Sequence, residues 1–314
     1  MSPTLVTGAS GLLGSRLVDV LLARGEPVVA LTRDPAAAAI DARCAVVVGD
    51  VGDQPLLERA IAAHGATTVF HLAAQTIAGA AREDPAATYA TNIIGTTTVL
   101  EAARRRGVRR AVVASSVTAY GPSAVPPYTE DMLLAPVDPY DISKAALDLV
   151  ARSYWPNHGL PVATARWTNV YGGGDRNTSR LVPELIGAAL DGRAPEIRSD
   201  GTPERDFLHV DDAVGAALAL ADALDDAQAG ARGEAFNAGS GRPVSVRAVV
   251  ETLERVLARP LHARYDPAPA PPSRQHVSHA KLTRVTGWAP RVDLDEGLRR
   301  TVAWHERERE RAAA

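Results

Sequence analysis

Short apolar runs, rich in β-branched residues, alternate with helical patterns through the first half of the chain. The runs are almost continuously apolar, so strands formed by them would be buried on both faces. Strands that alternate with helices predict a parallel sheet covered by helices on both sides. We therefore expect an α/β fold of the Rossmann type, which is a doubly wound parallel sheet. The runs occupy residues 4–8, 27–32, 44–50, 67–74 and 110–116, and the first helical pattern covers residues 11–24.

The second half of the chain has longer intervals between its apolar runs. One more strand pattern covers residues 161–172, and the stretches 172–180 and 198–206 that follow are rich in Gly, Pro and Arg. Loops of this kind usually carry ligand contacts. We therefore expect a smaller C-terminal α/β lobe that completes a binding site on the sheet.

Composition excludes several classes of protein. The 314 residues include 34 Lys and Arg and 37 Asp and Glu, for a formal net charge of -3, and this balance predicts no contact with nucleic acid. A single cysteine, Cys44, excludes a disulfide framework and a Cys-based metal site, and no metal is expected. The N-terminus enters an apolar strand without a charged leader, and no apolar run could cross a bilayer. We expect a cytoplasmic protein with no membrane contact.

A glycine-rich turn joins the first apolar run to the first helical pattern. Residues 7–14 read TGASGLLG. In such a turn the first glycine makes the bend, the second lets the backbone approach a pyrophosphate, and the third allows close helix packing. The helix N-terminus also attracts phosphates, so the turn predicts a dinucleotide site. The candidate cofactor contacts are Gly8, Ser10, Gly11, Leu12, Leu13 and Gly14.

The end of the second run bears on which nicotinamide dinucleotide is bound. A carboxylate at this place would hold the ribose hydroxyls of NAD, whereas an arginine accommodates the 2′-phosphate of NADP. Thr32 occupies the usual acidic position, Arg33 follows it, and Asp34 could neutralise that arginine. The pattern favours NADP slightly and leaves NAD open.

Tyr140 and Lys144 stand four residues apart at the start of a predicted helix, just after Pro139. This spacing places both side chains on one face, a turn apart. A lysine ammonium beside a phenol favours the phenolate, and an oxidised nicotinamide ring adds positive charge that lowers the pKa further. Tyr140 could then take a proton from a hydroxyl near neutral pH. We assign catalytic roles to both residues.

Taken together, these motifs resemble the extended short-chain dehydrogenases/reductases, and among them the NAD(P)-dependent nucleotide-sugar epimerase/dehydratase family. The glycine spacing, the YxxxK pair and a closing element at Gly287-Trp288 carry the resemblance over almost the whole chain. It implies that Ser116 is the catalytic hydroxyl. It also implies further cofactor contacts at Asp50, Val51, Leu72, Ala73, Ala74 and Asn92, the last of them structural, besides Thr32, Arg33, Tyr140 and Lys144.

The resemblance also implies a division of the chain and a second binding surface. Residues 1–172 would form the NAD(P)-binding Rossmann domain, with 206–238 packing back onto it, and 173–314 would be mainly the substrate-binding lobe. His209 is not read as a metal ligand. The residues that match family positions for the nucleotide-sugar substrate are Ser116, Asn169, Arg180, Leu181, Ile197, Arg198, Arg205 and Arg274.

Two residues after Ser116 bear on the reaction type. Similar 4,6-dehydratases carry an Asp-Glu pair there, whereas this chain has Val117 and Thr118, and neither is a general acid or base near neutral pH. The pattern is closer to UDP-sugar 4-epimerases, and Thr118 is counted with the catalytic group. The scaffold around Ile197-Arg198 is similar to CDP-glucose dehydratase relatives, so the base stays open between UDP, CDP and another nucleotide.

We therefore expect a nucleotide-sugar 4-epimerase that works by transient oxidation to a 4-keto sugar. The alternatives are an NDP-4-keto-sugar reductase, an NDP-hexose 4,6-dehydratase and, from another class, a catalytically silent NAD(P)-binding sensor. The resemblance also implies a homodimer. Its contact faces would be the helices expected at residues 86–106 and 140–154.

Overall fold

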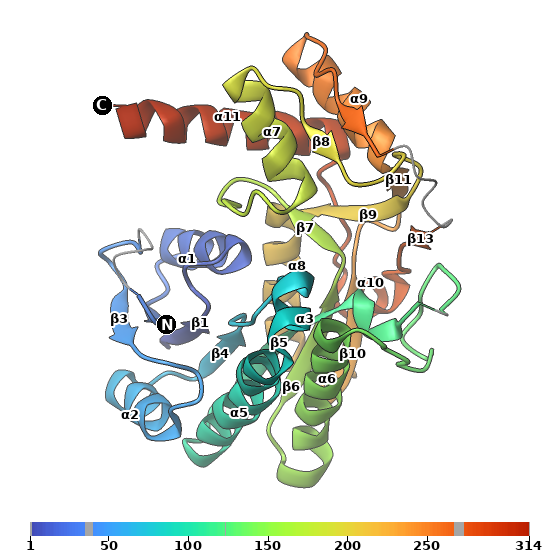
Figure 1. Ribbon diagram of the computed structural model, residues 1–314. Helices are drawn as coiled ribbons and strands as arrows, with labels where there is room; N and C mark the ends of the chain where they lie inside the picture. The colour runs from blue at the N-terminus through green and yellow to red at the C-terminus, as the bar shows by residue number, and fades with distance from the viewer. Residues whose placement is uncertain (1, 35–39, 123, 267–272, 314) are drawn as a thin grey trace.

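The computed structural model describes residues 2–34, 40–122, 124–266 and 273–313. Its main feature is a parallel sheet of seven strands, in the order β10-β6-β5-β4-β1-β2-β3 (Figure 1). This arrangement confirms the predicted Rossmann-type class. The strands are β1 (Thr4–Thr7), β2 (Val28–Thr32), β3 (Ala45–Val48), β4 (Thr68–His71), β5 (Arg110–Ser116), β6 (Val162–Trp167) and β10 (Glu234–Ala238).

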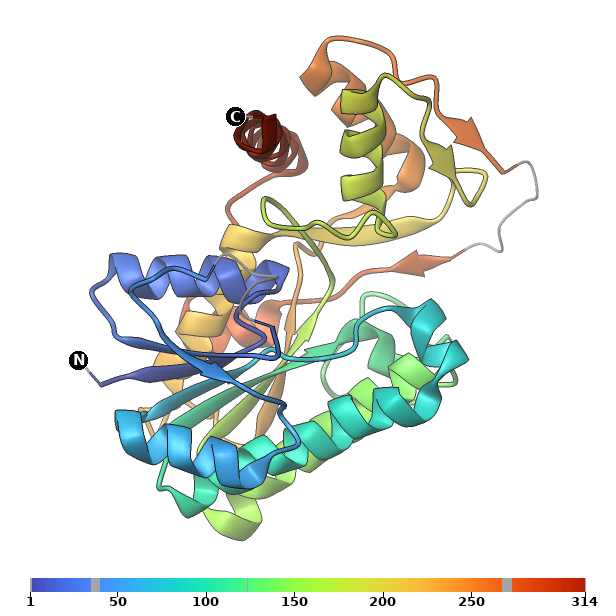
Figure 2. The ribbon, with the colours of Figure 1, turned by 60° about the vertical axis from the view of Figure 1, so that its left-hand side comes forward.

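Helices cover the sheet on both faces, as Figure 2 shows. One face packs against α1 (Leu12–Ala23), α8 (Val210–Ala223) and α10 (Ala280–Thr286). The opposite face packs against α2 (Gln54–His64), α5 (Gly95–Arg105) and α6 (Pro139–His158). Each face of the sheet has its own apolar core, and successive residues of a strand point into opposite cores. Val6 packs into the core under α1 and α8, and its neighbour Leu5 packs into the core under α2 and α5. This alternation is why the inner strands are apolar at every position.

Strand β3 departs from the predicted burial on both faces. It lies at the edge of the sheet, and its residues alternate between partly buried and exposed. Val46 and Val48 keep 43% and 55% of their surface exposed. An edge strand has a neighbour on one side only, so its apolar composition alone does not reveal its position.

The helix expected at residues 86–106 forms from three pieces. It consists of α4 (Pro85–Tyr89), a turn of π-helix η1 (Ala90–Ile94) and then α5, and the short α3 (Ala78–Glu83) precedes it. The π-turn carries Asn92, whose amide donates to the Gln75 carbonyl at 3.0 Å and to the Ser143 hydroxyl at 2.8 Å. Such turns often mark functional sites, and this one links helix α6 to the loop after β4.

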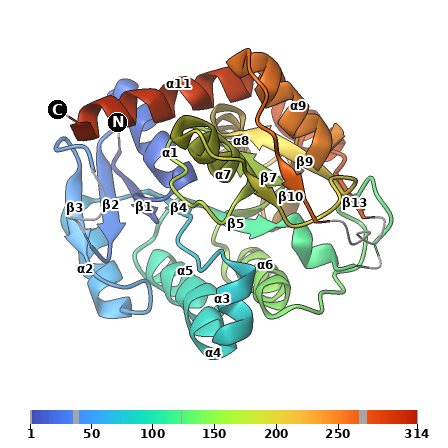
Figure 3. The same cartoon turned by 45° about the horizontal axis from the view of Figure 1, so that its top comes forward.

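The C-terminal part adds a smaller lobe beside the carboxyl ends of the strands. A second sheet of β11 (Pro243–Ser245), β9 (Glu204–His209), β13 (Arg274–Gln275) and β7 (Asn169–Tyr171) forms its base. The short strands β8 (Glu196–Ile197) and β12 (Arg264–Tyr265) pair separately. Helices α7 (Leu181–Asp191), α9 (Val246–Leu257) and α11 (Leu294–Ala313) share a third apolar core (Figure 3). Among the described residues, no helix is both long and apolar enough to cross a membrane.

Candidate active site

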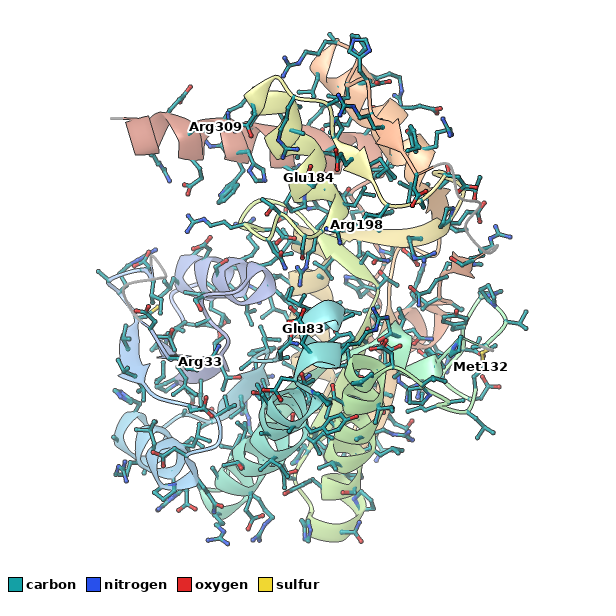
Figure 4. All side chains as sticks on the ribbon, viewed as in Figure 1. Arg33, Glu83, Met132, Glu184, Arg198 and Arg309 are labelled. Carbon is teal, nitrogen blue, oxygen red and sulfur yellow. The ribbon has the colours of Figure 1, made fainter. Side chains whose placement is uncertain are left out.

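A cavity of about 1080 Å³ lies at the carboxyl ends of the central strands, where the C-terminal lobe faces the sheet. Doubly wound sheets bind their ligands at this edge. Figure 4 labels Arg33 on the Rossmann side and Arg198 in the lobe, and both residues line the cavity. The cavity therefore reaches from the end of β2 to the strand β8 of the lobe and extends across the two parts.

The glycine-rich turn is as tightly built as its sequence predicts. Gly8 has φ of +69°, and a Cβ on it would lie 2.7 Å from the Ala73 nitrogen. A Cβ on Gly14 would lie 2.0 Å from the Gly8 carbonyl oxygen. Gly11 is the N-cap of α1 and makes no side-chain hydrogen bond to its first N–H groups, and residues 11–14 of this first turn line the cavity. The turn is therefore suited to hold a pyrophosphate.

Replacing Gly14 by alanine tests the turn, and we expect a loss of cofactor affinity on the order of tenfold or more. The added methyl would collide with the Gly8 carbonyl and push α1 away from the turn. Titration of the dinucleotide by calorimetry measures the loss. Gly187→Ala in α7 is the matched control, since nothing lies within 4 Å of a Cβ there. Equal affinities of the two variants would contradict the role of the turn.

The remaining candidate cofactor residues lie along the cavity, with one exception. Thr32, Arg33, Asp50 and Val51 line its end beside β2 and β3, and residues 72–74 line the wall beside β4. Asn92 is fully buried behind that wall and does not line the cavity. Its amide holds Gln75 and Ser143 instead, so the structure gives it the structural role and no direct cofactor contact.

The candidate catalytic group lies in the middle of the cavity. Asp138 caps α6, and Pro139 occupies its first turn, so the helix begins immediately before Tyr140. The Lys144 Nζ donates to the Ala114 carbonyl at 3.0 Å and lies 6.0 Å from the centre of the Tyr140 ring. Ser116 ends β5 and lines the same cavity as Tyr140 and Lys144. Strand β5 and helix α6 thus bring three residues together that are far apart in sequence.

Burial is the main cause of the pKa shifts of Tyr140 and Lys144. Burial raises the pKa of the Tyr140 phenol to about 12, against the smaller lowering effects of the Ser116 hydroxyl and the Arg180 charge. Burial also lowers the pKa of Lys144 to about 8. Tyr140 is therefore a phenol near neutral pH unless a further positive charge lies beside it. An oxidised nicotinamide ring would carry such a charge.

Val117 and Thr118 follow Ser116 in a short 3₁₀ turn, η2 (Val117–Tyr120). Val117 is buried in a small apolar cluster with Tyr120 and Tyr128 and does not line the cavity, whereas Thr118 does. The Thr118 hydroxyl lies 3.0 Å from the Ser116 hydroxyl. Neither position places a carboxyl group at the reacting centre.

Most candidate substrate residues also line the cavity, on the side of the lobe. The Arg180 guanidinium donates to Asp175 at 3.2 Å and to Thr76 at 3.1 Å, which joins the two parts across the cavity. The Arg205 guanidinium donates to the Ser273 hydroxyl at 2.8 Å, and burial lowers its pKa. The predicted residues found along this side are Asn169, Arg180, Leu181, Ile197, Arg198 and Arg205.

Arg274 is not among the residues that line the cavity. Its guanidinium pairs with Glu204 at 2.7 Å on the outside of the lobe, where 59% of the arginine side chain is exposed. The pairing follows from the register of β13 against β9, which sets Arg274 opposite Glu204. Sequence position alone did not show on which side of this sheet the arginine would lie.

Several residues that line the cavity were not predicted from the sequence. Thr76 and Thr178 contribute hydroxyl groups, and Phe207 and Val246 contribute apolar surface at the far end. Thr76 lies two residues beyond the candidate contacts at 72–74, so that stretch could have been extended by two residues. The other residues lie on loops and strands of the lobe whose orientation no local pattern reveals. No cluster of three metal-ligating side chains occurs in the part of the chain that the structure describes.

A Rossmann-type sheet with this turn and a Ser-Tyr-Lys group defines the extended short-chain dehydrogenases/reductases. The model of the NAD dependent epimerase/dehydratase family matches residues 4–239. The chain belongs to this family, which confirms the resemblance inferred from sequence.

Curated relatives include both activities of the family. A dTDP-glucose 4,6-dehydratase of Streptomyces griseus is 34% identical over 328 residues, which cover 97% of this chain and 94% of the relative. A UDP-glucose 4-epimerase of Mycolicibacterium smegmatis is 33% identical over 314 residues, which cover 95% and 97%. The solved structure of DesIV, a dTDP-glucose 4,6-dehydratase from Streptomyces venezuelae with NAD bound, matches with a TM-score of 0.86 and 31% identity over 98% of each chain. The chain is therefore an enzyme of this NAD-dependent family.

Proposed function

We propose that the protein is a nucleotide-sugar 4-epimerase. The observation that carries this proposal is the composition of the reacting centre, where Ser116, Tyr140 and Lys144 meet without a carboxyl group at positions 117 and 118. Oxidation and re-reduction at a carbinol carbon need a proton acceptor and a hydride carrier, and nothing else. Removal of water also needs an acid and a base at neighbouring carbons.

In this proposal each of the three residues has a separate role in proton transfer. Tyr140 takes the proton of the C4 hydroxyl and later returns it, while Ser116 holds the reacting oxygen by a hydrogen bond. Lys144, fixed by the Ala114 carbonyl, lends positive charge to the phenolate. The glycine-rich turn would hold NAD(P), which would supply the acceptor and donor of hydride for C4. Inversion at C4 would also require the cavity to let the 4-keto sugar turn and present its other face between the two transfers.

We propose that the two parts of the chain divide the two ligands. The Rossmann part would hold the dinucleotide, and Arg180 and Arg205 of the lobe would bind the diphosphate of the sugar nucleotide. Planar guanidinium groups suit phosphate oxygens. A homodimer remains part of this proposal. Its support is apolar surface on the expected contact helices, where Ile94 and Leu149 keep 59% and 57% of their surface exposed.

We propose that the cofactor is NAD or NADP, with a slight preference for NADP, because Arg33 lines the end of the cavity beside β2, where the adenosine would lie, and Thr32 stands in the usual acidic position there. For Arg33→Gln we expect the affinity for NADP to fall about 10- to 100-fold and that for NAD to change little, since a charge-assisted contact is lost only with the 2′-phosphate. Calorimetric titration of both dinucleotides measures this. Arg24→Gln, at the exposed end of α1, is the control. Tighter binding of NAD than of NADP by the wild-type protein would contradict the preference for NADP.

A 4-keto-sugar reductase is the second candidate, and Arg33 favours it as well, because NADPH is a reductant that such an enzyme would consume. Incubation with UDP- and CDP-linked glucose, galactose and glucuronic acid, without added reductant, separates the candidates by NMR. The proposal predicts interconversion of 4-epimers. A 4-keto-6-deoxy product would assign a dehydratase, and turnover only with NADPH and a keto sugar would assign a reductase. Tight cofactor binding without turnover of any sugar nucleotide would assign a sensor.

A further inference from the structure

One hydrogen bond crosses the cavity from the lobe to the Rossmann part. The Arg180 guanidinium donates to the Thr76 hydroxyl at 3.1 Å and to the Asp175 carboxylate at 3.2 Å. Arg180 stands at the start of α7 in the lobe, whereas Thr76 lies in the loop after β4. We call the hydrogen bond between Arg180 and Thr76 the clasp. The clasp spans the cavity from one wall to the other.

The order of the strands places the clasp across the path of a dinucleotide. In the sheet, β4 lies between β1, which leads into the glycine-rich turn, and β5, which ends at Ser116. A dinucleotide with its pyrophosphate on the turn and its nicotinamide ring beside Tyr140 would therefore pass the carboxyl end of β4. Thr76 lies in the loop that follows this end and lines the cavity. A bond from Thr76 to the lobe would close over the middle of the cofactor.

A second cavity meets the first at the clasp. It has a volume of about 910 Å³ and lies between α1, the loop at 173–177 and the second half of α11. Its lining includes Arg307 and Arg311, which are exposed, so this cavity opens to solvent. The residues that line both cavities include 10–12 of the glycine-rich turn, Thr76, Asp175 and Arg180. The clasp therefore stands between the proposed cofactor site and an opening to solvent.

The Arg180 side chain is the part of this region that is free to move. Asp175, which holds its other end, is buried. The loop that carries Asp175 is closely packed, since a Cβ on Gly173 would lie 2.7 Å from the Trp304 ring of α11. Arg180 is partly exposed, however, and Thr76 is exposed. Water competes with an exposed hydrogen bond, so the clasp can open while the loop and Asp175 stay in place.

We propose that the clasp is a gate that opens each time the dinucleotide enters or leaves its site. The inference deepens the proposed function and rests on the proposed position of the dinucleotide on the glycine-rich turn. An epimerase returns to the sugar the hydride that it removed, so its cofactor must stay bound between the two transfers. Arg180 has five N–H donors, and its bonds to Thr76 and Asp175 leave donors free for the diphosphate of the sugar nucleotide. The gate is therefore compatible with the proposed substrate contact.

The variant Thr76→Val tests the gate, because it removes the acceptor of the clasp and keeps the shape of the side chain. The gate would then be open for a larger share of the time, so association and release should both become about three- to tenfold faster. The affinity should stay within about twofold, because the same bond is lost in the free and in the bound protein. Stopped-flow fluorescence of NADPH and of NADH measures both rates without a sugar nucleotide.

Two further variants serve as controls. Thr76→Ser keeps the hydroxyl and should keep both wild-type rates. Thr252→Val removes a threonine of α9 that accepts from Arg255 at 2.9 Å and lines neither cavity, so it should also leave the rates unchanged. Thermal unfolding of each variant checks the fold.

Two results would overturn the proposal. One is a pair of rates for Thr76→Val within about twofold of the wild type. The other is a faster release without a faster association, because Thr76 would then be a direct contact of the cofactor. Turnover plays no part in these rates, so a gate without epimerisation, or epimerisation without a gate, would show which of the two proposals had failed.

Discussion

Replacing Tyr140 by phenylalanine is expected to lower kcat by about 10²- to 10⁴-fold with little change in KM. The variant keeps the ring in place and removes only the hydroxyl that exchanges a proton with the substrate. General acid-base catalysis is worth about this factor. Initial rates of epimer formation over a range of substrate concentrations give both constants.

The control for this variant is Tyr265→Phe. Tyr265 is a partly exposed tyrosine of the lobe that lies outside the cavity lining, and its ring contacts Arg247. Its loss of a hydroxyl should leave kcat unchanged. If Tyr140→Phe retained kcat within about threefold of the wild type, another group would have to accept the proton.

Replacing Asp148 by asparagine is expected to lower the free energy of unfolding by about 3–5 kcal/mol. Asp148 and Arg166 are completely enclosed, with exposed side-chain fractions of 0% and 1%, and they share two hydrogen bonds of 2.9 Å. An asparagine keeps the shape but leaves the guanidinium without a counter-charge in the core. Chemical denaturation of both proteins measures the difference.

The matched control is Asp41→Asn, which breaks an exposed ion pair with Arg43. Such pairs contribute about 1 kcal/mol at most. A loss below about 1 kcal/mol for Asp148→Asn would show that water or another side chain compensates Arg166.

The buried pair also matters for the site. Asp148 lies one turn after Lys144 on α6, and Arg166 lies on β6 beside β5. Arg166 further donates to the Tyr120 hydroxyl at 2.8 Å, and Tyr120 ends the turn that carries Thr118. The ion pair therefore fixes helix α6 and turn η2 to the same strand. The catalytic group gains its geometry from this connection.

Much of the fold could be predicted because its signals are local. Each inner strand is buried on both faces and so consists almost wholly of apolar residues, and the bend at Gly8 requires a positive φ that favours glycine. The spacing of Tyr140 and Lys144 follows from the period of a helix. These features depend only on a few neighbouring residues, so the sequence shows them directly.

The remaining features depend on packing between distant segments. The side of the lobe on which Arg274 lies is set by the pairing of β13 with β9, and the contact of Arg180 with Thr76 joins residues 104 positions apart. The π-turn at Asn92 has no distinctive composition. The raised pKa of Tyr140 is likewise a result of burial, which no sequence pattern measures.

The most direct test of the central proposal uses a nucleotide sugar that carries deuterium at C4 as substrate, with NMR analysis of the product. Transient oxidation at C4 with return of the same hydride to the other face predicts a 4-epimer that retains deuterium at C4, formed without added reductant. A 4-keto-6-deoxy product with deuterium at C6 would contradict the epimerase and assign a dehydratase, since the hydride would then have been delivered to the carbon that lost its hydroxyl.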